Sequence, residues 1–122
     1  MKQKKLSSAE WTVMDVIWQG SDVSARDVVD KMKELESWNK NTTYTVLNRL
    51  IQKGFIKRDE PNFICTPLIS KEDTTYTETV SFLEKIYNGS LKMMVSNFLS
   101  KENLSQKELE EIKSIIDSKK DN

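Results

Sequence analysis

Histidine is absent from this chain of 122 residues, and cysteine occurs once. Without a second cysteine no disulfide can form within the chain, and no Cys/His zinc site can be assembled. Histidine general bases, Ser-His-Asp triads and Cys-His dyads are excluded as well. No glycine-rich phosphate loop is present either, so we predict a protein that is not an enzyme and binds no cofactor or metal. We expect Cys65 to be a small buried side chain in a strand.

Long apolar runs are missing too. No stretch approaches the ~18 residues that would span a membrane, and no apolar stretch follows the basic start, so we expect a cytoplasmic protein. Hydrophobic residues make up 37% of the chain, which is enough for a core but low for a single rigid globule. A domain of about 70 residues buries only a small core. The remaining residues are therefore expected to gain burial from a partner chain.

Net charge is zero, which at first argues against binding to nucleic acid. The charges are, however, unevenly distributed. No acidic residue occurs from Ser37 through Arg58, and the basic residues of this segment are Lys40, Arg49, Lys53, Lys57 and Arg58. Because DNA responds to the local charge of the face that meets it, this segment is a candidate nucleic-acid interface.

Three helices are predicted in the first half of the chain. Ser7 and Glu10 form a capping box that begins the first helix, and Gly20 is expected to end it because glycine accepts the left-handed conformation. A second helix begins after Ser24. The third is expected from about residue 41 to residue 53, where another glycine follows.

A short β-hairpin is predicted directly after the third helix. Phe55–Arg58 and Phe63–Thr66 are rich in apolar and β-branched residues, and Asp59–Asn62 between them has the composition of a turn. Pro67 cannot donate to a strand ladder and is expected to end the second strand. Three helices followed by a hairpin is the order of a winged helix-turn-helix. The predicted fold class is therefore mainly α with a small β-hairpin, and residues 1–69 are expected to form a winged-helix DNA-binding domain.

Residues 70–122 are predicted to form three further helices, which begin near Ser70, Leu91 and Ser105. Their apolar faces are too large to be buried within three short helices. Burial across a two-fold axis explains these faces, and it pairs two recognition helices for a palindromic operator. We therefore predict a C-terminal helical dimerisation region with these contact residues: Leu83, Tyr87, Leu91, Met94, Val95, Phe98, Leu99, Leu109, Ile112 and Ile116.

The third helix is expected to lie in the major groove of DNA, which admits one helix and displays the base edges. Helical periodicity directs its apolar residues and one threonine inward: Thr43, Val46, Leu47, Leu50 and Ile51. The residues left outward carry hydroxyl, amide or guanidinium groups: Thr42, Tyr44, Thr45, Asn48, Arg49 and Gln52. Two carboxylates at the hairpin tip would be repelled by phosphates, so the basic contacts expected around them are Lys53, Lys57 and Arg58.

Several motifs, spread over nearly the whole chain, are shared with one known family: Ser7–Met14 with Ile17 and Trp18, Thr42–Leu50, Lys53–Ile56, Pro67-Leu68, Asn97-Phe98 and Asn103–Gln106. On these motifs the sequence resembles the BlaI/MecI penicillinase-repressor family, which also includes the copper-responsive CopY repressors. The resemblance implies a homodimeric repressor that binds an inverted-repeat DNA operator, controls β-lactam resistance genes and regulates its own operon. It also implies these DNA contacts: Asn41, Thr42, Tyr44, Thr45, Asn48 and Arg49.

The same resemblance implies an induction mechanism. A membrane-bound sensor-transducer protease system detects a β-lactam, and the repressor is then cleaved in its dimerisation region between Asn97 and Phe98. One departure from the family lies before the recognition helix, where Lys40 and Asn41 replace the proline and lysine often found there. The tail also lacks the cysteine pairs of CopY proteins, so copper sensing is not expected.

Two alternatives stay open at this point. Zero net charge and the acidic hairpin tip would favour a winged-helix adaptor that binds another protein rather than DNA. A repressor of the same family that responds to a different signal fits the motifs as well.

Overall fold

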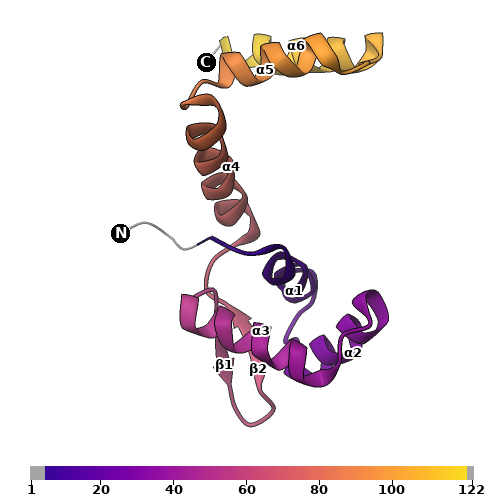
Figure 1. The fold of residues 1–122 in the computed structure, drawn as a ribbon, viewed down its shortest axis with the longest axis vertical. Coiled ribbons are helices and arrows are strands. Elements are labelled where there is room, and N and C mark those ends of the chain that lie inside the picture. Colours follow the sequence, from indigo (N-terminus) through magenta and orange to yellow (C-terminus); the bar gives the residue numbers. More distant parts are fainter. Residues whose placement is uncertain (1–4, 121–122) are drawn as a thin grey trace. The chain divides into compact units, whose positions relative to one another are not determined.

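The computed structural model describes residues 5–120 and divides into two compact units, one ending at Thr79 and one beginning at Val80. The N-terminal unit contains α1 (Ser8–Gln19), α2 (Ala25–Glu36), α3 (Lys40–Lys53), β1 (Ile56–Asp59) and β2 (Ile64–Pro67) (Figure 1). α4 (Lys71–Tyr87) crosses into the C-terminal unit, which also contains α5 (Leu91–Lys101) and α6 (Gln106–Lys120). The predicted class, mainly helical with one small hairpin, is confirmed. In the part of the chain that is described, no helix has both the length and the apolarity needed to cross a membrane.

Side-chain caps fix the starts of the first two helices. Ser7 Oγ accepts a hydrogen bond from the backbone N–H of Glu10 (3.2 Å), and Glu10 Oε1 accepts one from the N–H of Ser7 (2.7 Å). Ser24 and Asp27 form the same reciprocal pair at the start of α2. Each cap satisfies N–H groups that the helix leaves unpaired, and such caps contribute about 1 kcal/mol. The predicted starts of both helices are confirmed.

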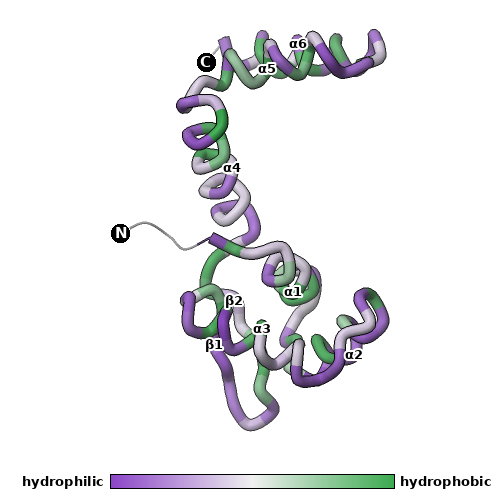
Figure 2. Tube along the Cα trace, in the orientation of Figure 1, coloured by the Kyte–Doolittle hydropathy of each residue, from purple (hydrophilic) through white to green (hydrophobic). Residues whose placement is uncertain are grey.

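The hydrophobic core of the N-terminal unit lies between its three helices and the hairpin. Figure 2 shows the apolar positions along α1 that contribute to it. Trp11 and Trp18 meet edge to face at the border of the core, with ring centroids 5.6 Å apart, and Trp18 Nε1 donates to the carbonyl of Ile69 (3.0 Å). Burying an aliphatic or aromatic side chain stabilises a fold by about 1.5–3 kcal/mol. This packing fixes α3 against the other two helices. The fully or nearly fully buried apolar side chains are Leu6, Val13, Met14, Ile17, Val23, Ala25, Val28, Met32, Val46, Leu47, Leu50, Phe55, Ile56 and Cys65.

Gly20 ends α1 as predicted, but the physical reason is different. Its φ of −98° and ψ of 179° are extended, not left-handed. A Cβ on Gly20 would lie 2.3 Å from Cγ2 of Val23, so glycine is required here by close approach. The left-handed conformation occurs instead at Gly54, where φ is +81° and the N–H bonds back to carbonyls of the last turn of α3.

The hairpin pairs β1 with β2 in antiparallel register, with Ile56 opposite Pro67 and Asp59 opposite Ile64. Each strand begins one residue later than predicted. The link between α1 and α2 pairs with β2 along its free edge. Val23 O accepts a hydrogen bond from the N–H of Cys65 (2.7 Å), and an isolated β-bridge joins Ser24 to Ile64. These backbone bonds attach the hairpin to the helices and therefore position it beside α3.

The start of α4 packs on the N-terminal unit. Thr74 is buried, the Glu78 carboxylate accepts a hydrogen bond from the N–H of Leu6 (3.1 Å), and Lys71 forms an ion pair with Asp15 (3.1 Å). These contacts account for the position of the boundary inside α4, whereas the sequence placed it after residue 69.

Candidate nucleic-acid interface

α3 is held at both ends and along one face. Asn39 Oδ1 accepts a hydrogen bond from the N–H of Thr42 (2.9 Å), so the helix begins at Lys40, one residue earlier than expected. The left-handed Gly54 ends it. As predicted, the residues buried on its inner face include Thr43, Val46, Leu47 and Leu50, and Ile51 is half-buried.

The opposite face of α3 is open to solvent. Thr45 Oγ1 donates to the carbonyl of Asn41 (2.9 Å), and the Thr45 side chain is exposed. Asn48 and Arg49 follow on the same face. Arg49 has no ion-pair partner among residues 5–120. The residues of this outward face, called the α3 face below, are Asn41, Thr42, Thr45, Asn48, Arg49 and Gln52, and all are exposed.

Tyr44 departs from the predicted outward set. It is half-buried because its ring packs against Phe63 of the hairpin, with centroids 5.9 Å apart. The Arg58 guanidinium lies over the Phe63 ring, with its Cζ atom 4.0 Å from the ring centroid. Periodicity within α3 could not predict this contact, because the residue that covers Tyr44 comes from the hairpin. The contact ties α3 to the hairpin.

The Lys53 ammonium contacts residues that precede or begin α1. Its ammonium lies 2.6 Å from Glu10 Oε1 and 2.9 Å from the carbonyl of Lys5. Glu10 is only 1% exposed, whereas the Lys53 side chain is 26% exposed. Burial by itself would raise the pKa of Glu10, but hydrogen bonds from Lys53 and Ser7 and the Lys53 charge outweigh it and hold the pKa below its ordinary value of 4.5. A DNA contact by Lys53 stays a prediction, and the structure gives its ammonium a structural partner.

The predicted wing cations are partly neutralised by the acidic tip. Lys57 Nζ lies 3.5 Å from Asp59 Oδ1, and Arg58 forms an ion pair with Glu60. Both basic side chains are about half exposed, so these pairs are surface ion pairs of small energetic value. The wing therefore presents little net charge. Among residues 5–120, the basic residues of α2 and α3 without an ion-pair partner are Arg26, Lys31, Lys33, Lys40 and Arg49.

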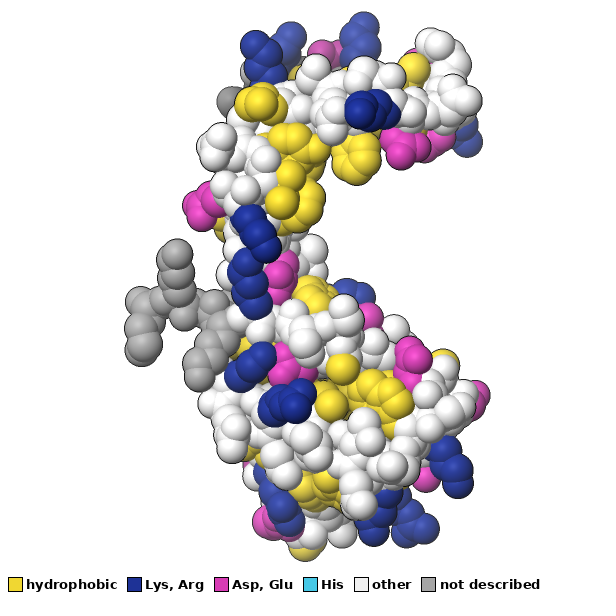
Figure 3. Space-filling model, in the orientation of Figure 1, with side chains coloured by type: hydrophobic (Ala, Val, Ile, Leu, Met, Phe, Trp, Pro, Cys, Tyr) yellow, Lys and Arg dark blue, Asp and Glu magenta, His cyan; other side chains and the backbone are white. Residues whose placement is uncertain are grey.

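Two basic residues outside the predicted set lie in the first turns of α2 and α3. Arg26 and Lys40 line one depression between α2 and α3, together with Tyr44. Figure 3 shows Lys and Arg side chains along the end of the N-terminal unit where Figure 1 places α2, α3 and the hairpin. From the sequence, Lys40 was only one of the basic residues of the acid-free segment, and no role was predicted for Arg26. Their positions in the first turns of two consecutive predicted helices were the available signal.

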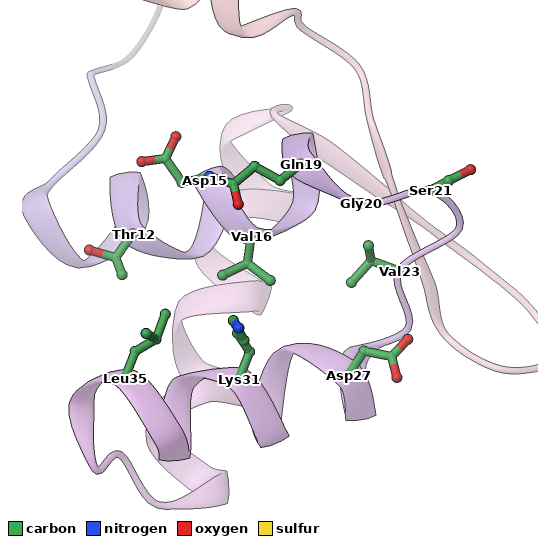
Figure 4. Close-up of a pocket in the computed structure, with 10 residues that line it drawn as sticks. All are labelled: Thr12, Asp15, Val16, Gln19, Gly20, Ser21, Val23, Asp27, Lys31 and Leu35. Carbon is green, nitrogen blue, oxygen red and sulfur yellow. The ribbon is translucent and has the colours of Figure 1, made fainter.

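A groove between α1 and α2 offers no comparable set of cations. Figure 4 shows Val16, Val23 and Leu35 as its aliphatic lining, and its charged residues are Asp15, Asp27 and Lys31. Lys31 extends from α2 toward Val16 of α1 in this view. It belongs to this groove and not to the α3 face.

Cys65 is buried in β2, and the expectation of a small buried strand residue is confirmed. Burial, with a contribution from the Asp27 charge, raises the pKa of its thiol to about 11. A thiol that stays protonated is a poor nucleophile and a poor metal ligand. Across residues 5–120, no cluster of three His, Cys, Asp or Glu side chains is placed to hold a metal ion.

The C-terminal unit leaves large apolar surfaces uncovered. Figure 3 shows hydrophobic side chains gathered over α4 and α5. Neither α5 nor α6 has a fully buried residue. Of the residues predicted for dimerisation, the half-buried ones are Leu83, Tyr87, Met94 and Val95, and the exposed ones are Leu91, Phe98, Leu99, Leu109, Ile112 and Ile116. An apolar groove between α5 and α6 is lined by Met94, Val95, Phe98, Leu99, Glu102, Leu104 and Ile112.

Three helices, a hairpin attached to them and an exposed, acid-free third helix define a winged-helix DNA-binding domain. The solution structure of the DNA binding domain of the repressor BlaI has this fold. It matches with a TM-score of 0.55 and 34% identity, over 59% of this chain and 90% of that one. The monomeric form of Bacillus licheniformis BlaI in complex with the blaP half-operator matches with a TM-score of 0.52, at the same identity and coverage.

Sequence comparison extends the likeness to the whole chain. A model of the penicillinase repressor family matches residues 6–118. The methicillin resistance regulatory protein MecI of Staphylococcus aureus strain N315 is 37% identical over 97% of this chain and 98% of its own length. The penicillinase repressor of Bacillus licheniformis is 36% identical over 98% of this chain and 94% of its own. The chain belongs to the penicillinase repressor family. These relatives are named as regulators and not as enzymes, so the prediction of a non-enzymatic repressor is confirmed.

Proposed function

We propose that this chain is a homodimeric transcriptional repressor that binds an inverted-repeat operator in the cytoplasm, with the α3 face of each subunit in the major groove. The observation that carries the proposal is the α3 face itself, which is exposed and has no acidic residue. Its Arg49 guanidinium has no ion-pair partner among the described residues and can contact a guanine or a phosphate. By analogy with its relatives, the regulated genes are those of β-lactam resistance and the repressor's own operon.

The DNA-binding role is tested with Arg49→Ala. The probe is a duplex selected by the purified protein from a random-sequence library. We expect Arg49→Ala to weaken binding to this duplex by about 10- to 100-fold, the loss typical of one base-contacting arginine. Lys31→Ala is the matched control, because it also removes one exposed positive charge but lies in the α1–α2 groove. Equal affinities of the two variants would remove Arg49 from the interface.

Selection of no duplex above non-specific background would favour the adaptor function instead. That alternative still has one observation in its support, which is the pairing of Lys57 and Arg58 with the acidic residues of the wing.

The dimer is supported by the uncovered apolar surface of the C-terminal unit. Phe98 is 54% exposed and Leu99 is 44% exposed, and both line the groove between α5 and α6. A second copy of the same helices offers an apolar face for such a groove and places two α3 helices on one operator. Sedimentation equilibrium at micromolar concentration is expected to give a dimer that Phe98→Ser weakens. A wild-type chain that stays monomeric throughout this range would contradict the proposal.

We further propose that repression is relieved by cleavage of the Asn97–Phe98 bond, as the family resemblance implies. This bond lies inside α5, and Asn97 Nδ2 donates to the hydroxyl of Tyr87 (3.1 Å). A cut there separates Phe98, the end of α5 and all of α6 from the DNA-binding unit. Dimer affinity then falls, and the gain from bivalent operator binding is lost.

The cleavage step is tested in cells with Asn97→Ala and Phe98→Ala. Each variant is expected to stay bound after a β-lactam is added. Asn97→Ala is expected to repress a reporter gene as the wild type does, whereas Phe98→Ala, which also loses part of the dimer contact, is expected to repress it less strongly. Normal induction of both variants, with intact protein seen by immunoblot, would show that release does not require this bond.

A further inference from the structure

A depression between the first turns of α2 and α3 gathers two positive charges from separate helices. Its lining consists of Arg26, Val29 and Asp30 from α2 and of Lys40 and Tyr44 from α3. Arg26 and Asp30 are one helical turn apart, as are Lys40 and Tyr44, so each pair shares a face of its helix. The depression therefore borders the α3 face and ends in the Tyr44 side chain that packs on the hairpin.

The depression is lined by two cations and one carboxylate. Within residues 5–120, neither Arg26 nor Lys40 takes part in an ion pair, and both are exposed. Asp30 is the acidic residue of the lining, and it leaves the depression with a net charge of one positive unit. Two like charges that line one depression repel each other, and an anion bound between them relieves the repulsion.

We propose that Arg26 and Lys40 together bind one phosphodiester group of the DNA backbone beside the recognition helix. This inference rests on the proposed function. Arg26 supplies a guanidinium fork that can bond two phosphate oxygens, and Lys40 supplies a point charge in the first turn of α3. Asn41, the next residue of α3, carries no charge, so Lys40 is the cation of that turn. The contact fixes the register of α3 on the duplex and does not read its bases.

The test compares Arg26→Ala/Lys40→Ala with the wild type on two duplexes. One duplex is selected from a random-sequence library by the wild-type protein, and the other is an unrelated sequence of equal length. Each affinity is measured from 0.05 to about 0.3 M salt. Each lost phosphate contact makes the negative slope of log K against log salt less steep by about 0.9, and at 0.1 M salt it weakens binding by roughly tenfold for each subunit bound. We expect this loss on both duplexes equally, because a phosphate contact carries no sequence information.

Three further variants distinguish failure of the phosphate contact from failure of the proposed DNA binding. Lys31→Ala is expected to retain the wild-type slope, and Arg49→Ala to lose mainly the preference for the selected duplex. Asp30→Asn removes the negative charge of the depression and is expected to strengthen binding to both duplexes. A double variant at Arg26 and Lys40 that keeps the wild-type slope, while the wild type binds its selected duplex, overturns the phosphate site alone. Failure of the wild type to prefer any duplex overturns the proposed function as well.

Discussion

Replacing Lys53 by methionine would leave the Glu10 carboxylate buried without its charged partner. Methionine keeps the apolar stem of the side chain and removes the ammonium that lies 2.6 Å from Glu10 Oε1. Glu10 would then retain the hydrogen bond from the N–H of Ser7 (2.7 Å). Breaking a buried ion pair by removing one member costs about 3–5 kcal/mol, and the 26% exposure of Lys53 places the expected loss near the lower end, at about 3 kcal/mol.

Urea unfolding at pH 7 and one fixed protein concentration measures this loss, because the stability of a dimer depends on concentration. Glu10→Gln keeps an oxygen for the Ser7 N–H and lets Lys53 reach water, so it is expected to cost about 1 kcal/mol. The double variant is expected to cost no more than Glu10→Gln alone, which gives a coupling of the order of 3 kcal/mol. Additive losses would refute the reasoning, because they would mean that the two side chains stabilise the fold independently.

The pH dependence of the unfolding free energy of the wild type and Lys53→Met tests whether Glu10 is ionised in the folded protein. The pKa of folded Glu10 is held below 4.5, so the stability that its ionised form contributes is present above pH 4.5 and is lost as the pH falls through the lower, folded value. In Lys53→Met the unpaired buried carboxylate is expected to protonate more easily. The difference in unfolding free energy between the wild type and Lys53→Met should therefore narrow below pH 4.5. A difference that stays constant down to pH 3 would contradict this assignment.

Three further predictions concern side chains away from the proposed interface. Gly20→Ala is expected to destabilise the N-terminal unit by about 1–3 kcal/mol through the clash with Val23. Adding Val23→Ala should recover part of the loss, and thermal unfolding compares the single with the double variant. Thr43→Val replaces a buried hydroxyl that has no hydrogen-bond partner among the described residues, so urea unfolding should show a gain of about 1 kcal/mol, and a loss would contradict the burial argument. Cys65, with its pKa raised to about 11, should react with a thiol reagent at pH 8 no faster than the protein unfolds, and rapid labelling of folded protein would oppose its burial.

The parts of the fold set by local signals could be predicted from the sequence. The serine caps and the helical periodicity identified the starts of α1 and α2 and the inner face of α3. The hairpin was predicted within one residue, since its turn has characteristic residue types. These features depend on residues a few positions apart in the chain.

The parts that depend on distant residues could not be predicted in this way. The pairing of Lys53 with Glu10 was not predicted, because the two residues are 43 positions apart and no local pattern joins them. Tyr44 was placed outward because the covering residue, Phe63, comes from the hairpin. Arg26 was missed because only the packing of α2 on α3 brings it to the same depression as Lys40.

Hydroxyl-radical footprinting of the wild-type protein on its library-selected duplex tests the central claim most directly. Two symmetric protected half-sites are expected, with centres separated by a multiple of about 10–10.5 base pairs so that both recognition helices meet the same side of the duplex. Protection should disappear in Arg49→Ala at the concentration that saturates the wild type. A single protected segment without symmetry, or no protection at all, would contradict a paired α3 face as the reader of the operator.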